Sequence, residues 1–199
     1  MSELFQSMPP GIYNKIRKKK IFIAGAGGLG SNVAMLLVRA GLEHLTIVDF
    51  DVIASHNLNR QFFFLSQIGM NKVDALKMNL LNINPEVEIK TYTTKLSQDT
   101  FHLINDDEYD IILECFDDPQ AKAQFVAYVL KNSPKVPIIA VSGLAGATSL
   151  ESIKLSKGTG LLWLVGDGVS DVSEGIGTMS TRVMFAATIQ AHQAISLLV

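Results

Sequence analysis

The sequence predicts a Rossmann-like α/β fold, with an open, mostly parallel sheet, helices on both faces and a small antiparallel extension. The first observation is that short apolar runs alternate with longer stretches whose apolar residues recur at helical spacing. The second is a βαβ signature, in which two apolar runs, residues 21–24 and 45–48, enclose a glycine-rich turn and a helical stretch. The third is a Lys-Gly-Thr-Gly turn between two short apolar runs, which predicts an antiparallel hairpin.

Hydrophobic periodicity places the individual elements along the chain. Proline and glycine set most of their boundaries, because the residue before a proline avoids the helical region and glycine accepts the left-handed conformation at a helix end. The expected helices cover residues 12–18, 31–40, 67–82, 99–105, 120–132 and 181–198. The expected strands cover residues 21–24, 45–48, 87–93, 109–116, 136–141, 150–155 and 161–165.

Composition limits the class of protein. The chain has 199 residues, 48% of them hydrophobic, which suits one domain with a full core. Its net charge of −2 argues against a nucleic-acid partner, and its single cysteine excludes an internal disulfide framework and a multi-cysteine zinc site. No apolar run approaches the ~20 residues of a membrane helix, and the N-terminus lacks the order of a signal peptide. We therefore expect a cytoplasmic protein with no membrane partner.

Residues 1–19 are expected to form an N-terminal arm ahead of a single domain at residues 20–199. Two consecutive prolines and a glycine separate the start of the arm from its short helix. The basic run at residues 17–20 is interpreted as a solvated lead-in to the first strand. A phosphate contact by Arg17 across a dimer is the alternative interpretation of this run.

The turn Gly-Ala-Gly-Gly-Leu-Gly is typical of a nucleotide-binding loop. Gly25 lets the chain turn off the first strand, and Gly27 and Gly28 allow a ligand to approach closely because they lack a Cβ atom. Gly30 allows the following helix to pack tightly on the strand. Free N–H groups at the start of that helix suit a phosphate, and Asp49 ends the second strand, where it can accept hydrogen bonds from ribose hydroxyls.

Several polar residues follow Asp49 at close intervals, and they are Asp51, Asn57, Arg60, Gln61 and Lys72. An ordinary dinucleotide site needs no such set, which disfavours a nicotinamide-dependent oxidoreductase. Two fixed cations, Arg60 and Lys72, suit a more highly charged ligand such as a triphosphate. We expect Asn57 and Gln61 to orient polar groups nearby. Asp51 is expected either to assist a metal or to brace Arg60.

These motifs resemble those of the ThiF/MoeB/HesA family, relatives of the ubiquitin-activating enzymes. The family pattern is approximately GxGGLG, then DxD, NLxRQ and GxxK, and all four pieces occur here in order between Gly25 and Lys72. A lone glycine motif is a weak signal, whereas this combination is specific. The resemblance spans most of the chain and is strongest over residues 20–75 and 108–120.

The resemblance implies that the domain binds ATP and Mg²⁺, with a metal-binding aspartate in an Asp-Asn pair after a strand. The matching pair here is Asp117-Asp118, and we assign Asp117 to Mg²⁺. A carboxylate at the carboxyl end of a parallel strand can hold that metal through the phosphates of a nucleotide. Asp118 is expected to cap the next helix, since Pro119 suits the first helical position. The departure from asparagine leaves open whether Asp118 also joins the metal site.

The resemblance further implies adenylation of the C-terminal glycine of a small ubiquitin-like sulfur carrier, a ThiS-like protein ending in Gly-Gly, with release of pyrophosphate. The segments at residues 143–146 and 166–168 resemble the compact branch tied to thiamine thiazole biosynthesis, and a homodimer is the expected assembly. The carboxylate is already a nucleophile, so no general base is required. The expected catalytic set is Arg60 and Lys72 on the phosphates and Asp117 on the metal.

The sequence departs from many sulfur-transfer relatives, which carry paired CxxC zinc motifs and a further reactive cysteine. Cys115 lies inside an expected strand, where a buried and inert core residue is predicted. We therefore expect no zinc and no covalent thioester or persulfide step on this chain. Two alternatives stay open: adenylation of a carboxylate on a modified tRNA base, and a nucleotide-binding relative without catalytic activity.

Overall fold

A seven-stranded sheet forms the centre of the computed structural model, which describes residues 3–105, 109–170 and 177–199. The strand order is β3-β2-β1-β4-β5-β7-β6, and every neighbouring pair is parallel except β6 and β7. The strands are β1 (Lys20–Ala24), β2 (His44–Val48), β3 (Glu88–Tyr92), β4 (Ile111–Glu114), β5 (Ile138–Val141), β6 (Lys154–Lys157) and β7 (Leu162–Gly166). The predicted fold class, including the antiparallel extension, is confirmed.

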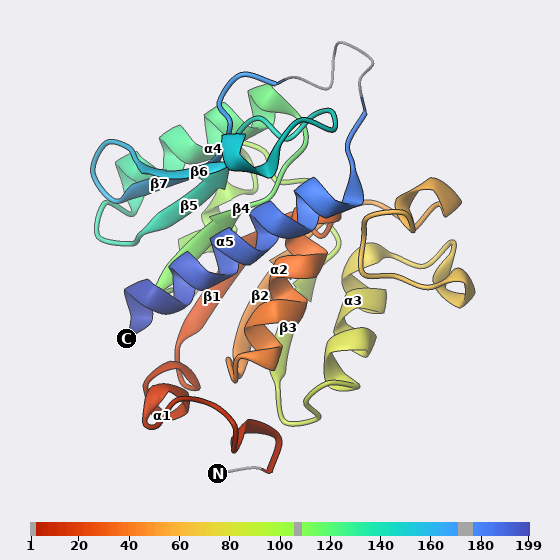
Figure 1. The fold of residues 1–199 in the computed structure, drawn as a ribbon, viewed down its shortest axis with the longest axis vertical. Helices are drawn as coiled ribbons and strands as arrows, with labels where there is room; N and C mark the ends of the chain where they lie inside the picture. The colour runs from red at the N-terminus through yellow and green to blue at the C-terminus, as the bar shows by residue number, and fades with distance from the viewer. Residues whose placement is uncertain (1–2, 106–108, 171–176) are drawn as a thin grey trace.

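Helices cover both faces of this sheet (Figure 1). One face carries α2, α3 and α5, and the other carries α4. Their bounds, with that of the short N-terminal helix, are α1 (Ile12–Ile16), α2 (Gly28–Arg39), α3 (Lys72–Leu81), α4 (Pro119–Asn132) and α5 (Ser180–Leu198). Among the described residues, no helix combines the length and the apolar composition needed to cross a membrane.

Strand β1 shows how the sheet divides the core into two layers. Ile21 and Ile23 point into the cluster beneath α2, α3 and α5, whereas Phe22 and Ala24 point into the cluster beneath α4. Successive side chains of a strand point to opposite faces, so a strand buried on both faces must be apolar throughout. This explains why the central strands appear in the sequence as continuous apolar runs.

The N-terminal segment packs against the amino-terminal end of the sheet. Phe5 and Ile16 are fully buried, and the Phe5 ring stacks on Tyr13 with centroids 4.8 Å apart. Tyr13 donates a hydrogen bond to Glu43, which precedes β2, and Nε of Arg17 lies 3.5 Å from the same carboxylate. Arg17 therefore lies at the amino-terminal end of the sheet, opposite to the end at which β1 leads into the glycine turn.

Most predicted starts differ from the observed ones by three residues or fewer, and the two largest differences are at α3 and β6. The helix expected from residue 67 begins at Lys72, because Gly69 adopts φ +88° after a short 3₁₀ turn at Leu65–Gln67. The strand expected at residues 150–155 begins at Lys154, after a 3₁₀ turn at Leu150–Ser152. The Ser149 hydroxyl accepts the Glu151 N–H there, a local bond that competes with strand pairing.

Candidate active site

The candidate site lies at the carboxyl ends of β1 and β4. From β1 the chain winds outward through β2 to β3, then returns to place β4 on the other side of β1. The strand order therefore reverses between β1 and β4, and the loops after these two strands leave the sheet in opposite directions. A crevice opens at a topological switch point of this kind, and ligands of this fold class bind there. The loops that enclose it begin at Gly25 after β1 and at Cys115 after β4.

The glycine turn requires its glycines for two separate reasons. Gly25 has φ +103°, and a Cβ atom there would lie 2.9 Å from the carbonyl oxygen of Cys115. A Cβ atom on Gly30 would overlap the carbonyl oxygen of Gly25, so α2 can start this close to β1 only with glycine. Gly27 caps α2 with φ −79°, and a Cβ atom there would meet only the Gln61 side chain, at 3.9 Å.

We expect Gly30→Ala to destabilise the protein by about 3 kcal/mol or more, because the new methyl group overlaps backbone that cannot move away. Gly27→Ala is the matched control and should leave the free energy of unfolding nearly unchanged, since its methyl group makes an ordinary van der Waals contact with Gln61 at 3.9 Å. Urea denaturation followed by circular dichroism measures both. Equal stability of the two variants would contradict the tight packing of α2 on β1.

Asp49 connects the second strand to the glycine turn. Its Oδ2 accepts the Ala26 N–H at 2.6 Å, and its Oδ1 accepts the Asp51 N–H at 2.8 Å. Burial raises the pKa of Asp49, and these two N–H donors oppose that rise. The carboxylate is therefore held in one orientation beside the turn.

A loop that carries Arg60 and Gln61 is fastened to the first two turns of α2. The Asn32 side-chain amide donates to the carbonyl oxygens of Gly28, at 2.6 Å, and Arg60, at 2.9 Å. The Ser31 hydroxyl accepts the N–H of Phe62 at 3.0 Å. Sequence reasoning missed both residues, although two polar side chains at the start of an apolar helix were a visible signal.

The same loop brings its side chains over the glycines. A Cβ atom on Gly28 would lie 3.6 Å from Cγ of Arg60, so the stem of this arginine crosses the glycine closely. The Arg60 guanidinium donates to the His56 carbonyl oxygen at 3.2 Å and to the Asn59 side chain at 2.9 Å. The guanidinium is thus held within its own loop rather than by a carboxylate.

Asn57 and Gln61 differ in how their polar atoms are satisfied. Asn57 is buried, and its Oδ1 accepts the Ala54 N–H at 2.9 Å, so it shapes the loop. Gln61 is also buried, yet its Oε1 has no hydrogen-bond partner among the described residues. A buried acceptor without a partner is unfavourable, and only a hydrogen-bond donor could satisfy it.

Asp51 pairs with Lys72 and not with Arg60, and its expected assistance to a metal stays a prediction. The two side chains lie 2.6 Å apart, and the Lys72 N–H also donates to the Asp51 carbonyl oxygen at 2.9 Å. Lys72 is buried at the first residue of α3. An ammonium group has three donors, so this pair leaves capacity for an anion.

The loop after β4 separates the two neighbouring aspartates. Asp118 is the N-cap of α4, with its Oδ1 accepting the Ala121 N–H at 2.6 Å, and this prediction is confirmed. Asp117 is exposed just before it. Beneath them Glu114 is fully buried and pairs with Lys122 at 2.6 Å. Burial raises the pKa of Glu114, and Lys122 opposes this rise. Sequence reasoning did not single out Glu114, an acid inside an apolar strand.

The acidic side chains fit a magnesium ion only together with a bound nucleotide. Mg²⁺ in nucleotide sites is usually held by one or two carboxylates, with substrate phosphates and water completing the octahedron. Asp117 supplies an exposed carboxylate of this kind at the mouth of the crevice. Within residues 3–105, 109–170 and 177–199, no three histidine, cysteine or acidic side chains are grouped as a ready-made metal site.

Cys115 is buried, as predicted, and its thiol contacts Oε1 of Gln190 at 3.6 Å. Burial raises the pKa of the thiol, and the nearby carboxylate of Glu114 raises it further. A thiol of this kind is a poor nucleophile, because the thiolate is the reactive form.

Native protein should therefore react with iodoacetamide at Cys115 much more slowly than unfolded protein does, as measured by mass spectrometry. Cys115→Ala should keep its catalytic rate within about twofold of the wild type, since the thiol touches no expected ligand. Rapid labelling of the folded protein, or an inactive but folded Cys115→Ala variant, would contradict this prediction.

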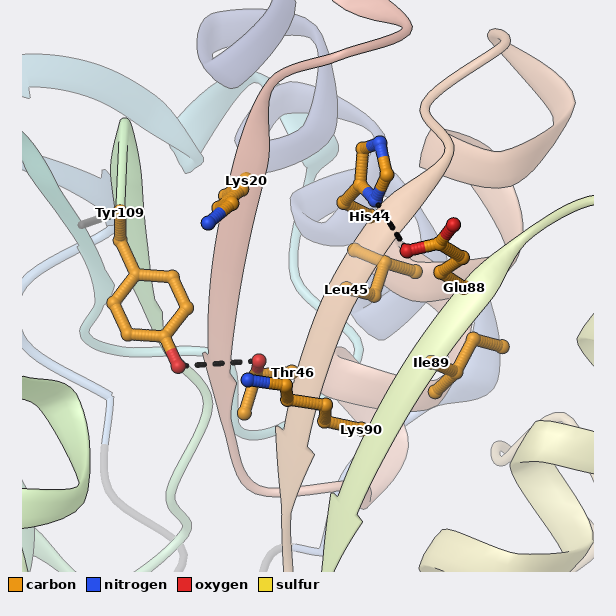
Figure 2. A pocket seen from close by; sticks show the side chains of 8 residues that line it. All are labelled: Lys20, His44, Leu45, Thr46, Glu88, Ile89, Lys90 and Tyr109. Atoms are coloured by element: carbon orange, nitrogen blue, oxygen red, sulfur yellow. Dashed lines mark hydrogen bonds and ion pairs between the residues drawn. The ribbon is translucent and has the colours of Figure 1, made fainter. Parts of the chain in front are cut away.

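A cavity of about 240 Å³ lies at the opposite end of the sheet, where Lys20, His44 and Glu88 form one row across β1, β2 and β3. Figure 2 shows the contact of His44 with Glu88 and the hydrogen bond from Tyr109 to Thr46. Each joins two atoms that lie 3.1 Å apart. Ligands of open parallel sheets bind at the carboxyl ends of the strands. We therefore place the site at the glycine turn and not in this cavity.

The fold, with a glycine turn at its switch point, defines an α/β protein of the Rossmann-like class. The sequence profile of the ThiF family matches residues 2–199, and the chain belongs to that family. The expected family resemblance is thereby confirmed.

Known relatives in sequence are longer proteins. Ubiquitin-like modifier-activating enzyme 5 of Caenorhabditis elegans is 35% identical over 120 residues, which cover 55% of this chain and 29% of that protein. Adenylyltransferase and sulfurtransferase UBA4 of Eremothecium gossypii is 38% identical over 132 residues, covering 65% of this chain and 29% of that protein. The chain thus spans under a third of the length of each.

Solved structures match the fold over nearly the whole chain. The E. coli tRNA N6-threonylcarbamoyladenosine dehydratase TcdA, in complex with ATP, has a TM-score of 0.86 at 19% identity, covering 97% of this chain and 90% of that one. E. coli MccB with ATP has a TM-score of 0.71 at 23% identity, covering 94% and 58% respectively. At these identities the likeness establishes the fold alone.

Proposed function

We propose that this chain is an ATP-dependent adenylyltransferase that activates the C-terminal glycine of a small ubiquitin-like carrier protein ending in Gly-Gly. The observation that carries the proposal is the Arg60–Gln61 loop, which Asn32 fastens over the glycine turn and whose Arg60 stem crosses Gly28. The names of the sequence relatives add support, because they include ubiquitin-like modifier activation and adenylyl transfer.

The reaction requires alignment and charge neutralisation rather than proton transfer. The carrier's carboxylate attacks the α-phosphorus of ATP, and pyrophosphate leaves with its negative charge increased. Arg60 and Lys72 are placed to bind the phosphates, with Asp51 holding Lys72 in position. Asp49 binds the ribose, with its carboxylate oriented by the two N–H donors.

Asp117 is the proposed magnesium ligand, and a bound Mg²⁺ ion would neutralise phosphate charge at the mouth of the crevice. A homodimer, a cytoplasmic location and a role in thiamine thiazole biosynthesis belong to the same proposal through the family resemblance. Because Cys115 is buried and unreactive, sulfur delivery falls to another protein.

ATP–pyrophosphate exchange tests the proposal, with Mg²⁺ present and with or without a ThiS-like carrier that ends in Gly-Gly. We expect exchange that depends on the carrier, and a carrier lacking the last glycine is the matched control. ATP binding without exchange for any such carrier would overturn carrier adenylation. Exchange that appears only with tRNA would favour adenylation of a carboxylate on a modified tRNA base.

A further inference from the structure

Side chains of α2 and α3 together hold the backbone from Arg60 to Phe62. From α2, the Asn32 amide donates to the Arg60 carbonyl oxygen. Ser31 of the same helix accepts the Phe62 N–H. From α3, the Asn79 side-chain amide donates to the Phe62 carbonyl oxygen at 2.8 Å. The two helices lie side by side on one face of the sheet (Figure 1), and this loop is bonded to both of them.

Gln67, in the 3₁₀ turn before α3, sets which way the Asn79 amide faces. The Phe64 N–H is a donor, so Gln67 Oε1, which lies 3.0 Å from its nitrogen, is the acceptor. Gln67 Nε2 then faces Asn79 and donates to its Oδ1 at 2.7 Å. The Asn79 nitrogen is left to face Phe62, with a second bond to Gln67 Oε1 at 3.2 Å. Every polar atom of these two buried amides is therefore bonded, in one orientation of each.

A pair of buried amides is a poor choice for stability alone. Asparagine is a weaker helix former than alanine or leucine, and a buried amide is unfavourable unless its donors and acceptors are bonded. Leu76 and Leu80, which flank Asn79 on α3, are fully buried and apolar. An apolar residue at the position of Asn79 would pack among them with fewer requirements. What a fully bonded amide pair achieves is a single, rigid position of the loop, because its hydrogen bonds are satisfied in one arrangement.

The helix that carries Asn79 also carries Lys72. Lys72 is the first residue of α3, and Asn79 follows about two turns later, which places both residues on the same side of the helix. Asp51 holds the Lys72 ammonium group. The Arg60 guanidinium donates to oxygen atoms of its own loop, so the position of the loop sets the position of the guanidinium. Asn79 thus connects the helix of one cation to the loop of the other.

We propose that Asn79 is a positioning residue that holds Arg60 and Lys72 at one fixed separation, suited to the outer phosphates of ATP, and that Gln67 orients its amide. Because the proposed function assigns both cations to the phosphates, this role rests on that assignment, although it does not depend on the identity of the carrier. Cations whose positions are set before the ligand arrives bind it more tightly, since no binding free energy is used to order them. Loss of Asn79 should therefore weaken binding of the outer phosphates and leave the rest of the nucleotide bound as before.

Isothermal titration of the whole protein with ATP or with AMP, in the presence of Mg²⁺ and without a carrier, tests this role. We expect Asn79→Ala to raise the Kd for ATP by about tenfold and the Kd for AMP by less than about twofold, because AMP lacks the outer phosphates. In an Arg60→Ala background the same substitution should change the Kd for ATP by less than about twofold, since the residue that Asn79 positions is gone.

Leu80→Ala is the control, because Leu80 is buried next to Asn79 in the chain and has no polar atom in its side chain. It should lower stability, measured by urea denaturation, and leave the ratio of the two Kd values unchanged. Gln67→Met should raise the Kd for ATP selectively, as Asn79→Ala does, because it removes the bond that orients the Asn79 amide while keeping nearly the same volume.

A folded Asn79→Ala variant with a wild-type Kd for ATP, or with both Kd values raised by the same factor, would overturn the role of Asn79. An equal loss of ATP affinity in the Arg60→Ala background would overturn it as well, because the effect would not act through Arg60. If Asn79→Ala does not fold, Gln67→Met decides, and a wild-type ratio of the two Kd values in that variant overturns the inference. If wild-type protein shows no carrier-dependent exchange while the Kd values respond as expected, carrier adenylation is overturned and the role of Asn79 stands.

Discussion

Arg60→Ala should lower the rate of carrier-dependent pyrophosphate exchange by about two to three orders of magnitude, with little change in stability. The arginine stem crosses Gly28 at the start of α2, and its guanidinium donates to a carbonyl oxygen and an amide oxygen of its own loop. Both partner residues, His56 and Asn59, are exposed, so removal of the Arg60 side chain should affect bound phosphate more than folding.

The measurement is exchange at saturating ATP and carrier, alongside thermal unfolding of the same sample. Arg39→Ala is a matched control, because Arg39 is exposed at the far end of the same helix. A rate for Arg60→Ala within a few-fold of that of the wild type would remove Arg60 from the proposed mechanism.

Substitutions of the two neighbouring carboxylates, Asp117 and Asp118, should have opposite effects: one on the exchange rate and the other on stability. Asp117→Asn should reduce exchange by about three orders of magnitude, because it removes the exposed ligand proposed for the metal, and should leave stability unchanged. Asp118→Ala should cost about 1 kcal/mol of stability, because it removes the N-cap bond to Ala121, and should leave the exchange rate within a few-fold.

Exchange measured over a range of Mg²⁺ concentrations, together with urea denaturation, separates these effects. Binding of Mn²⁺ in the presence of ATP, followed by electron paramagnetic resonance, gives a readout independent of turnover and should be weakened only in Asp117→Asn. If Asp118→Ala impairs Mn²⁺ binding as severely, both carboxylates belong to the metal site.

Much of the fold and part of the site follow from local rules. The βαβ signature, the glycine turn and the acid at the end of β2 are close in sequence, and each has a local steric or electrostatic reason. The helix cap at Asp118 and the burial of Cys115 were predictable for the same reason. Those features placed the chain in its fold class before any contact between distant residues was known.

The contacts that distinguish this site join residues from separate elements. Asp51 bonds Lys72 rather than Arg60, because the bend at Gly69 brings the start of α3 back to the residues that follow β2. Asn32 reaches the Arg60 carbonyl oxygen because the loop folds back across α2. The sequence does not predict either contact, because each contact depends on the path that the chain takes between the two partners.

The loops after β5 and β7 show the same division most clearly. The sequence alone shows a segment of small residues after β5 and an arginine at the start of a helix, and no pattern in it indicates that the two are in contact. The folded chain brings Arg182 under the loops after β5 and β7, where its donors meet Asp167 and three carbonyl oxygens. Local patterns predict elements and motifs, whereas the role of a buried charged side chain depends on the partners that tertiary packing brings to it.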